Sequence, residues 1–494
     1  MSAPHQDPED IDNAPEMLDA DEADEVIDDA DGDIAMDSDD DGENFEIDIQ
    51  NDSVAYFDAH KNAVYAIAQH PTQPTLIATG GSEGEDEEDP GKGYVFDTSP
   101  VVGRPVLPPS YNADPHAPQQ KSTELSPIFA IEGHTDSVNA LAFTLPHGEF
   151  LVSGGLDGRM RVNQLSIDGR NKASFKFLAE SQEVQEINWL APCPVGPNSP
   201  GVANTIALGA DDGSVWVYTI DASDESNPLQ IVQSYYLHGG PCTAGAWSPD
   251  GKFLATVAED STLNVWDVWG EAGAKGLTNQ NGQTVVSLTV FKDEGMQQKR
   301  KENEDEPERL GLFSVAIDPK SSYVAVGGFY PGNACLKIVS LPHFSNKGNK
   351  AGGTILTELA VQKESVETLS FSPTKPLLAA GSVDGSIIVY DTSRNFKPKR
   401  TIQEAHDHSV VKVEFLRGSG DGWLLTSCGM DGVVRRWNIQ GEADAVADSM
   451  VKEWKGHSAC DESGRGGILG FVQGATGERI VTAGDDGLAL VFEA

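Results

Sequence analysis

The chain is 494 residues long and has a formal net charge of −44, because 78 acidic side chains stand against 34 lysines and arginines. Such an acidic surface repels the phosphates of nucleic acids and favours cationic proteins, so direct nucleic-acid binding is not expected. No apolar run reaches the roughly 18 residues that a membrane span needs, and the N-terminus lacks the pattern of a secretory signal.

The first segment of the chain is an acidic tail. Residues 1–52 contain 22 Asp and Glu and no Lys or Arg. Because residues 1–44 are highly charged and poor in large apolar side chains, they cannot bury a core, and we predict that they are disordered. Two roles are open for this tail: a mobile second binding site for a basic partner, or the maintenance of solubility.

From Phe45 onward, short β-rich runs are separated by Gly, Asp and Pro, and the pattern repeats. Four segments align clearly with one another: 131–162, 236–267, 362–391 and 404–438. Weaker copies begin near His60, Glu180, Leu310 and His457. In the first unit an acidic insert, EGEDEED (83–89), replaces the turn aspartate of the other units. We count eight units, with seven as the alternative, in one all-β domain over residues 45–494.

The units share four features in register: a histidine before the first strand, a Ser or Thr, an aspartate four residues later, and a Trp six residues after the aspartate. This combination resembles the WD-repeat β-propeller family over roughly residues 54–494, which implies a ring of four-stranded blades. The resemblance also implies that the four side chains form a buried hydrogen-bonded tetrad in each blade. Two units contain all four residues: His238, Thr256, Asp260 and Trp266, and His406, Ser427, Asp431 and Trp437.

Other units depart from the tetrad pattern, and we expect their blades to be less rigid. The Trp position holds Asn163, Tyr218, Tyr390 and Phe492, and the Ser/Thr position holds Leu208 and Ala380. A propeller ring closes when a strand from one terminus completes the last blade, and residues 53–57 suit this role beside residues 489–493.

Two long insertions interrupt the repeat. Residues 98–127 contain seven prolines and are expected to join the third and fourth strands of the first blade as a flexible flap on the wide face. Residues 293–310 indicate a solvated charged loop, with the KRK at 299–301 as an alternative nuclear import signal.

No catalytic motif is present: there is no GxSxG elbow, no Walker-type glycine loop and no HExxH. Histidines and aspartates recur at fixed repeat positions, which favours structural roles over metal ligation or acid–base catalysis. The five cysteines are scattered without a CxxC pair, which indicates buried free thiols in a reducing compartment. We therefore expect no enzymatic activity, no metal and no cofactor.

Three units place a second acid directly before the turn aspartate: Asp211, Glu259 and Asp485. The family resemblance implies that this position and the start of each first strand form the narrow face around the central channel. The strand-start residues are Tyr65, Glu183, Phe313 and Glu367, and apolar surface is added by Leu156, Val383 and Met430. No Lys occupies these positions, and the only cation among them is Arg465.

Two interpretations of the narrow-face acids stay open. An acidic protein scatters acids over its whole surface, and these positions can be ordinary examples. Alternatively, segregated carboxylates pair with an Arg/Lys-rich peptide while aromatic side chains stack on its guanidinium groups. We predict the second, with these partner-binding residues: Tyr65, Glu183, Asp211, Glu259, Phe313, Glu367, Met430 and Asp485.

Within the WD-repeat family, a closer similarity is carried by the acidic tail, YFDAHKNAVYAIAQHP, ATGGSEG, GHTDSVNALAF and ESVETLSFSPTKPLLAAGSVDGSIIVYD. These segments resemble the family of the angio-associated migratory cell protein and its fungal counterpart. The resemblance implies a monomeric cytoplasmic chaperone, with the nucleus as the alternative location. Its client would be the large-subunit ribosomal protein numbered sixteen in the universal nomenclature, captured by its basic N-terminal segment and delivered to the pre-60S particle.

Two other classes of function stay open from the sequence. A histone-binding chromatin subunit also uses an acidic propeller. A signalling or ubiquitin-ligase scaffold normally adds a helical module such as an F-box, and the tail shows no apolar periodicity that would indicate one. Co-purification from cell extract separates ribosomal from histone clients.

Overall fold

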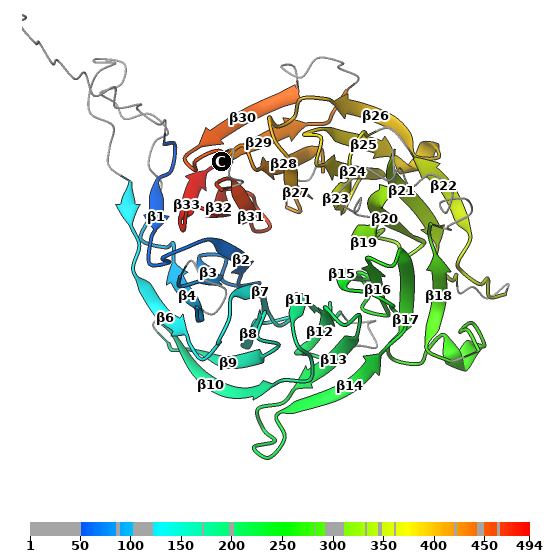
Figure 1. The fold of residues 1–494 in the computed structure, drawn as a ribbon, viewed down its shortest axis with the longest axis horizontal. Helices are drawn as coiled ribbons and strands as arrows, with labels where there is room; N and C mark the ends of the chain where they lie inside the picture. Colours follow the sequence, from blue (N-terminus) through cyan, green and yellow to red (C-terminus); the bar gives the residue numbers. More distant parts are fainter. Residues whose placement is uncertain are drawn as a thin grey trace, which may run out of the picture. The chain divides into compact units, whose positions relative to one another are not determined.

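The computed structural model describes residues 51–84, 89–101, 122–169, 172–196, 202–280, 282–291, 311–330, 333–343, 348–359, 362–418, 422–441, 449–461 and 465–494. All of them belong to one compact unit, Ile49–Ala494. They form eight sheets arranged in a ring, with the first strand of each sheet innermost (Figure 1). This confirms the eight-bladed all-β propeller. The predictions on residues 1–44, on the charged loop 293–310 and on most of the Pro-rich insertion lie outside the described residues.

Seven blades are antiparallel sheets whose four strands follow one another in sequence from the centre outward. Blades one and two consist of β2 (Val64–Gln69), β3 (Leu76–Ser82), β4 (Gly91–Asp97), β6 (Pro127–Ile131), β7 (Val138–Phe143), β8 (Phe150–Gly155), β9 (Met160–Ile167) and β10 (Ala173–Ser181). Blades three and four consist of β11 (Ile187–Pro192), β12 (Thr205–Ala210), β13 (Val215–Ile220), β14 (Leu229–Tyr235), β15 (Cys242–Trp247), β16 (Phe253–Ala258), β17 (Thr262–Asp267) and β18 (Thr284–Thr289).

The remaining blades follow the same order. Blades five and six consist of β19 (Gly311–Ile317), β20 (Tyr323–Tyr330), β21 (Asn333–Ser340), β22 (Ile355–Leu359), β23 (Val366–Phe371), β24 (Leu377–Ser382), β25 (Ile387–Asp391) and β26 (Lys397–Ile402). Blade seven consists of β27 (Val410–Phe415), β28 (Leu424–Gly429), β29 (Val433–Asn438) and β30 (Met450–Lys455). Two single 3-10 turns, η1 (Gly273–Lys275) and η3 (Thr392–Arg394), complete the regular structure of the described residues.

Blade eight contains both ends of the described chain. Its strands β31 (Ile468–Val472), β32 (Arg479–Gly484) and β33 (Ala489–Glu493) are followed by β1 (Ala55–Phe57), which pairs antiparallel with β33, Ala55 lying opposite Val491. The predicted closure is therefore confirmed. A fifth strand, β5 (Thr123–Glu124), pairs parallel with β1 and covers its outer edge.

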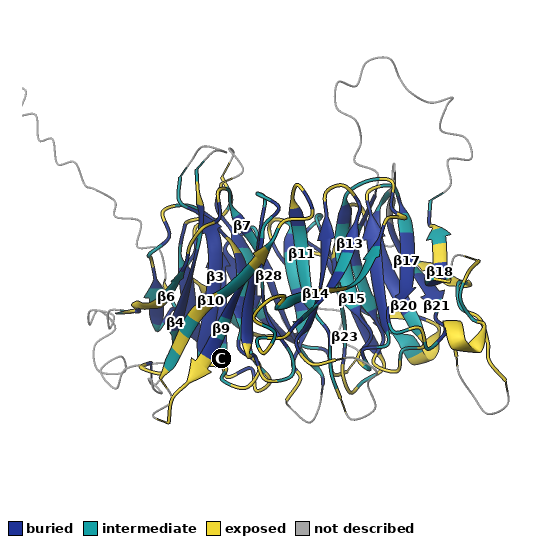
Figure 2. Cartoon of the chain, turned by 90° about the horizontal axis from the view of Figure 1, so that it is seen from below, coloured by how far each residue is buried: buried dark blue, intermediate teal, exposed yellow. Residues whose placement is uncertain are grey.

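The core lies between neighbouring blades. One hydrophobic cluster joins Val215 and Val217 of blade three to Leu254 and Trp266 of blade four. Burial of this kind explains why the middle strands are rich in Val, Ile and Leu, since each sheet is covered on both faces. Figure 2 shows the buried residues concentrated in the strands, whereas an outer strand such as β10 alternates with exposed residues.

The cysteines agree only in part with the expected burial. All five are free, and four are buried, but Cys460 is half-exposed in the loop that enters blade eight. The described residues contain no helix of the length and apolarity needed to cross a bilayer.

Candidate functional site

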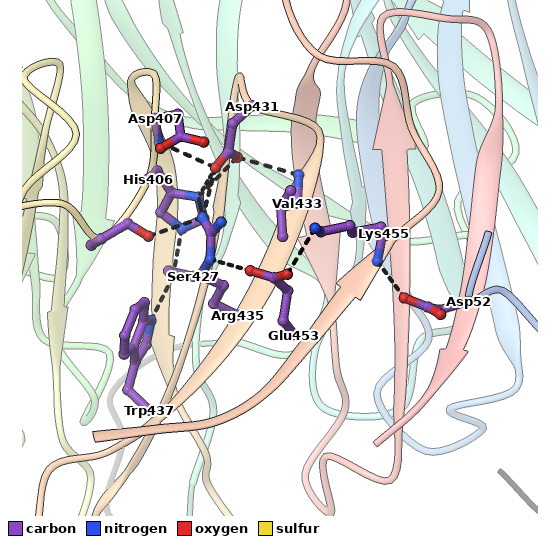
Figure 3. A network of polar contacts seen from close by, with 11 residues as sticks. Asp52, His406, Asp407, Ser427, Asp431, Val433, Arg435, Trp437, Glu453 and Lys455 are labelled. Atoms are coloured by element: carbon purple, nitrogen blue, oxygen red, sulfur yellow. Dashed lines mark hydrogen bonds and ion pairs between the residues drawn. The ribbon is translucent and has the colours of Figure 1, made fainter. Parts of the chain in front are cut away.

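Blade seven forms the complete tetrad (Figure 3). His406 Nε2 lies 2.7 Å from Ser427 Oγ, and Trp437 Nε1 donates to the same oxygen at 2.8 Å. On the other side of the imidazole, His406 Nδ1 lies 2.9 Å from an Asp431 carboxylate oxygen. Gly432, with φ 74°, lets the chain reverse directly after the aspartate. The tetrad therefore fixes the turn between β28 and β29 from inside the blade.

The Asp431 carboxylate is buried and accepts a further hydrogen bond of 2.6 Å from Arg435. Burial by itself raises the pKa of Asp431. Hydrogen bonds and charges from His406 and Arg435 outweigh burial and lower this pKa to about 2. The Asp431 carboxylate is thus ionised, and its hydrogen bonds stabilise the fold.

The same network reaches the segment that closes the ring. Arg435 Nε donates to Glu453 at 2.7 Å, and Glu453 forms an ion pair of 3.2 Å with Lys455. The backbone N–H of Lys455 donates to the Asp52 carboxylate at 2.9 Å, as Figure 3 shows. Polar contacts therefore connect the tetrad of blade seven to the residues directly before β1.

Blade four assembles its predicted tetrad by a different route. His238 Nε2 lies 2.7 Å from Thr256 Oγ1, and Trp266 Nε1 donates to that oxygen at 2.8 Å. However, His238 Nδ1 lies 2.5 Å from the Thr262 hydroxyl, which in turn donates to Asp260 at 2.6 Å. The inserted hydroxyl replaces the direct histidine–aspartate contact that the tetrad pattern implies.

Blade one replaces the tetrad aspartate with Glu83, the first residue of the acidic insert. Its carboxylate accepts a 3.0 Å hydrogen bond from the Tyr94 hydroxyl and pairs with Lys61 at 3.4 Å. His60 keeps only its contact with Thr79, at 2.9 Å. Glu83 therefore serves the blade, and residues 85–88 of the insert lie outside the described residues.

In blade three, one predicted site residue, Glu183, lies at a different register from the one expected. Glu183 stands four residues before Ile187, the first residue of β11, as His134 stands four residues before Val138 in blade two. It thus occupies the register of the tetrad histidine and not the start of the first strand. Its side chain is exposed and accepts a weak hydrogen bond from Ser181 at 3.5 Å.

A ring of side chains, which we call the turn ring, precedes the tetrad-aspartate register in every blade. Because strands one and two are antiparallel, this position lies at the same end of the blade as the start of the first strand. Its members are Ser82, Leu156, Asp211, Glu259, Phe329, Val383, Met430 and Asp485. Four predicted site residues belong to it.

A second ring is formed by β-bulges. The pairing of the first and second strands shifts by one residue in all eight blades, after the first paired position in seven of them and after the second in blade five. A bulge turns its extra side chain away from the regular ladder. This bulge ring consists of Tyr65, Asn139, Asn188, Thr243, Phe313, Glu367, Val411 and Leu469. The predicted residues Tyr65, Phe313 and Glu367 are members of it.

The acids of the two rings differ in their exposure to solvent. Asp211, Glu259 and Glu367 are exposed. Asp485 is half-buried, because its carboxylate accepts a 2.6 Å hydrogen bond from the backbone N–H of Gly466. The expectation that all the second acids project freely into solvent is therefore wrong for Asp485, which is held in place by the loop of its own blade.

The aromatic members lie beside these acids. The Tyr65 side chain is 43% exposed. Its pKa is raised by partial burial and by the negative charges of Asp485 and Asp136, so blades eight, one and two meet there. Across the ring, between blades four and five (Figure 1), a Cβ built on Gly311 would lie 3.2 Å from Phe313 Cζ and 3.0 Å from Glu259 Cα, which places these two residues together.

Sequence reasoning missed the ring members Phe329, Val411 and Leu469, and it also missed Asp136, whose negative charge acts on Tyr65. The bulge moves the face position by one residue, and no local sequence rule marks it. In seven blades the bulge residue directly follows the first residue of the first strand, and in blade five it follows Leu312, the second residue of β19. An alignment of these residues would have found the bulge ring.

The opposite face of the propeller contains a separate cavity of about 1170 Å³. Its lining includes the turns after the first strands, among them Pro71, Leu145, Pro194 and Gly474, and the C-terminal Ala494. It contains none of the members of the turn ring or the bulge ring. Among the described residues no cluster of three or more His, Cys, Asp or Glu could hold a metal ion.

The family model "WD domain, G-beta repeat" matches residues 125–162, 229–267 and 353–391. The ribosome assembly protein SQT1 of Saccharomyces cerevisiae is 28% identical over 473 residues, which cover 92% of this chain and 89% of that protein. The human angio-associated migratory cell protein is 24% identical over 449 residues, with 90% and 80% of the two chains covered.

Solved structures extend the similarity. The crystal structure of Chaetomium thermophilum Sqt1 is 54% identical, with a TM-score of 0.75, and the match covers 90% of this chain and 98% of that one. A crystal structure of the same protein bound to the N-terminus of the ribosomal protein L10 is 55% identical, with a TM-score of 0.76 and coverage of 90% and 100%.

Proposed function

The chain belongs to the Sqt1 family of WD-repeat β-propellers, and from this premise we propose that it is a dedicated chaperone of a large-subunit ribosomal protein. It binds the basic N-terminal segment of the newly made client, the counterpart of L10, on the face formed by the turn ring and the bulge ring. It then delivers the client to the pre-60S particle. The role requires binding alone and is placed in the cytoplasm.

The observation that carries this proposal is the set of carboxylates on one face. Asp211, Glu259 and Asp485 have no ion pair within 4.0 Å among the residues that the structure describes. Unneutralised carboxylates around a rim attract Arg and Lys side chains and raise the rate of association. Tyr65 and Phe313 lie beside them and supply faces for cation–π contacts.

The relatives support the same assignment. The SQT1 relative is a ribosome assembly protein, and a structure more than half identical to this chain holds the N-terminus of a ribosomal protein. That degree of identity over the whole propeller favours a shared client class.

Charge reversal on the ring tests the proposal. Asp211→Lys and Glu259→Lys are each titrated calorimetrically with an Arg/Lys-rich N-terminal peptide of the ribosomal client. A like charge at an interface costs several kcal/mol, so affinity should fall by about a hundredfold or more. The matched control is Glu225→Lys, an exposed acid of blade three in the loop between β13 and β14, at the opposite end of the blade from Asp211.

Circular dichroism establishes that each variant is folded. If both ring reversals bind the peptide as tightly as the control, the acids are ordinary surface charge and the proposed face is wrong. Co-purification of the full chain from cell extract tests the client itself, since recovery of histones in place of a ribosomal protein would overturn the assignment.

A further inference from the structure

The bulge ring is chemically uneven. In blades two to four the bulge residue is polar and holds the next blade: Asn139 donates to the Ile187 carbonyl at 2.7 Å, and Asn188 to the Cys242 carbonyl at 3.2 Å. Thr243 donates to the Leu312 carbonyl at 2.5 Å. In these three blades, the bulge side chains bind one blade to the next.

Blades seven, eight and one each present an apolar side chain in one of the two rings. Leu469 of blade eight and Tyr65 of blade one occupy the bulge position, and Met430 of blade seven occupies the turn position. Tyr65 is 43% exposed, and Met430 and Leu469 are half-buried. A Cβ built on Gly467 would lie 3.0 Å from Met430 Sδ, so the thioether covers the loop that leads into β31. We call these three residues the apolar sector.

The fold does not require apolar residues at these positions. Asparagine occupies the bulge register in blades two and three, and Ser82 occupies the turn register in blade one. Val411, the bulge residue of blade seven, packs against the core between blades seven and eight, whereas the apolar sector is absent from the core clusters of the described residues. Apolar side chains on neighbouring blades that serve no core mark an interaction surface.

The charge around the apolar sector specifies its occupant. Tyr65 of blade one has Asp485 in the neighbouring blade eight and Asp136 directly before the first strand of blade two, and the negative charges of both act on it. Both carboxylates are held by backbone N–H groups, Asp485 by Gly466 at 2.6 Å and Asp136 by Ser137 at 2.6 Å. A ligand that covers the sector therefore brings cationic groups to either side of an apolar one. This is the chemistry of a basic segment interrupted by large apolar or aromatic side chains.

We propose that the client segment carries at least one large apolar or aromatic side chain between its cationic residues, and that this side chain packs on Tyr65, Met430 and Leu469. The inference rests on the proposed function and adds a second criterion to it. Charge brings the segment to the face, and apolar contact selects which basic segment stays there. A purely ionic rim would bind any segment of equal charge.

The test uses the full chain and two arginine-rich peptides of equal length and charge, one with leucine and one with serine at the same intervening positions. The leucine peptide should bind about tenfold more tightly, as expected for a well-packed interface anchor. Its binding should also show a more negative heat-capacity change, the mark of apolar burial, which a purely ionic contact does not give.

The variant Tyr65→Asn/Leu469→Asn should lose both differences, because asparagine is the natural residue at this register in two blades and disturbs the fold little. Ile231→Asn, at an exposed apolar position of the outer strand β14, is the matched control and should keep them. Thermal melting checks that both variants are folded.

Two outcomes overturn the inference: equal affinity of the wild type for the two peptides, or an unchanged leucine preference in the double variant. Neither outcome contradicts the proposed function. That function is contradicted if the wild type binds none of the peptides, or if Glu259→Lys binds both as tightly as the wild type. The two hypotheses are therefore decided separately.

Discussion

Where two acids are adjacent before a turn, the second stabilises the turn and the first lies on the surface. In blade four the Asp260 carboxylate accepts hydrogen bonds from the Gly239 N–H at 2.5 Å and from the Thr262 N–H at 2.9 Å, whereas the Glu259 side chain is exposed. In blade seven the equivalent pair is Asp431 and the apolar Met430. The aspartate register is thus fixed by the turn, and the preceding register is left to the surface.

Removal of these carboxylates should give a ranked series of stabilities. Asp431→Ala removes a buried carboxylate that binds His406 and Arg435, with Glu453 remaining as the carboxylate partner of Arg435, and should cost about 3 kcal/mol. Asp260→Ala loses hydrogen bonds to N–H and hydroxyl groups and should cost about 1–3 kcal/mol. Glu259→Ala should be nearly neutral, since an exposed carboxylate contributes little.

Urea unfolding of the three variants measures this series. Equal losses for Asp260→Ala and Glu259→Ala would contradict the division between acids of the fold and acids of the face.

Two buried histidines make stability depend on pH. Burial lowers the pKa of His60 from 6.5 to about 4, assisted by the charge of Lys92. Burial also lowers the pKa of His238 to about 4, against the opposing charge of Asp260. Between pH 6.5 and 4 the unfolded chain therefore binds more protons than the folded chain, so stability is complete above this range and falls as the pH falls through it.

Each histidine should contribute a slope of up to about 1.4 kcal/mol per pH unit within that range. Unfolding free energies measured from about pH 7 to about pH 5 should decline less steeply in His60→Gln and in His238→Gln than in the wild type. Parallel curves for the wild type and both variants would show that other groups control the acid sensitivity.

At the scale of elements, ring closure depends on a three-residue strand. β1 lies between β33 and the parallel strand β5, so the short closing strand has hydrogen-bonded neighbours on both sides. Phe57 at its end is fully buried and stacks on Phe96 of blade one, with ring centroids 4.5 Å apart. One aromatic side chain therefore joins blade eight to blade one.

Phe57→Ala should destabilise the propeller by about 3–5 kcal/mol, because it leaves a cavity at the closure and removes the aromatic contact. Differential scanning calorimetry measures the effect, with the exposed neighbour Asp58→Ala as the control. A melting temperature within the error of the control would mean that the ring is closed by hydrogen bonds of β1 alone.

At the scale of the whole molecule, charge is distributed unevenly. Residues 1–52 carry 22 of the 78 acids and no base. The turn-ring acids Asp211, Glu259 and Asp485 lie on one face of the propeller. Long-range attraction of a basic client is screened by salt, whereas contacts with the apolar sector are not. Capture and retention therefore respond to different conditions.

Affinity for an arginine-rich client peptide should fall at least tenfold when ionic strength rises from about 0.1 M to about 1 M, where the Debye length shrinks from about 10 Å to about 3 Å. Titrations of the whole chain and of a chain without residues 1–44 measure this dependence. A weaker affinity of the shortened chain at low salt would identify the tail as a second binding site, and equal affinities would leave it a role in solubility. Binding that is insensitive to salt would contradict an acidic face.

The sequence by itself determined the architecture, because each blade is a local unit whose turn, tetrad and strands lie within one repeat. Repeat spacing predicted eight blades and the closing strand, and the identities of Ser427, Asp431 and Trp437 indicated the tetrad of blade seven. Local patterns also located Asp211, Glu259 and Met430, since the turn aspartate marks the preceding residue directly.

Only the tertiary structure decided which residues share the face. A bulge in every first strand shifts the register by one residue and brings Leu469 onto the face, whereas the start of β11 at Ile187 places Glu183 at the histidine position. Contacts between separate segments determined that Asp485 is held by Gly466 and that Thr262 stands between His238 and Asp260. These features depend on how strands and loops approach one another in three dimensions, and a repeat pattern along the chain carries no information on that approach.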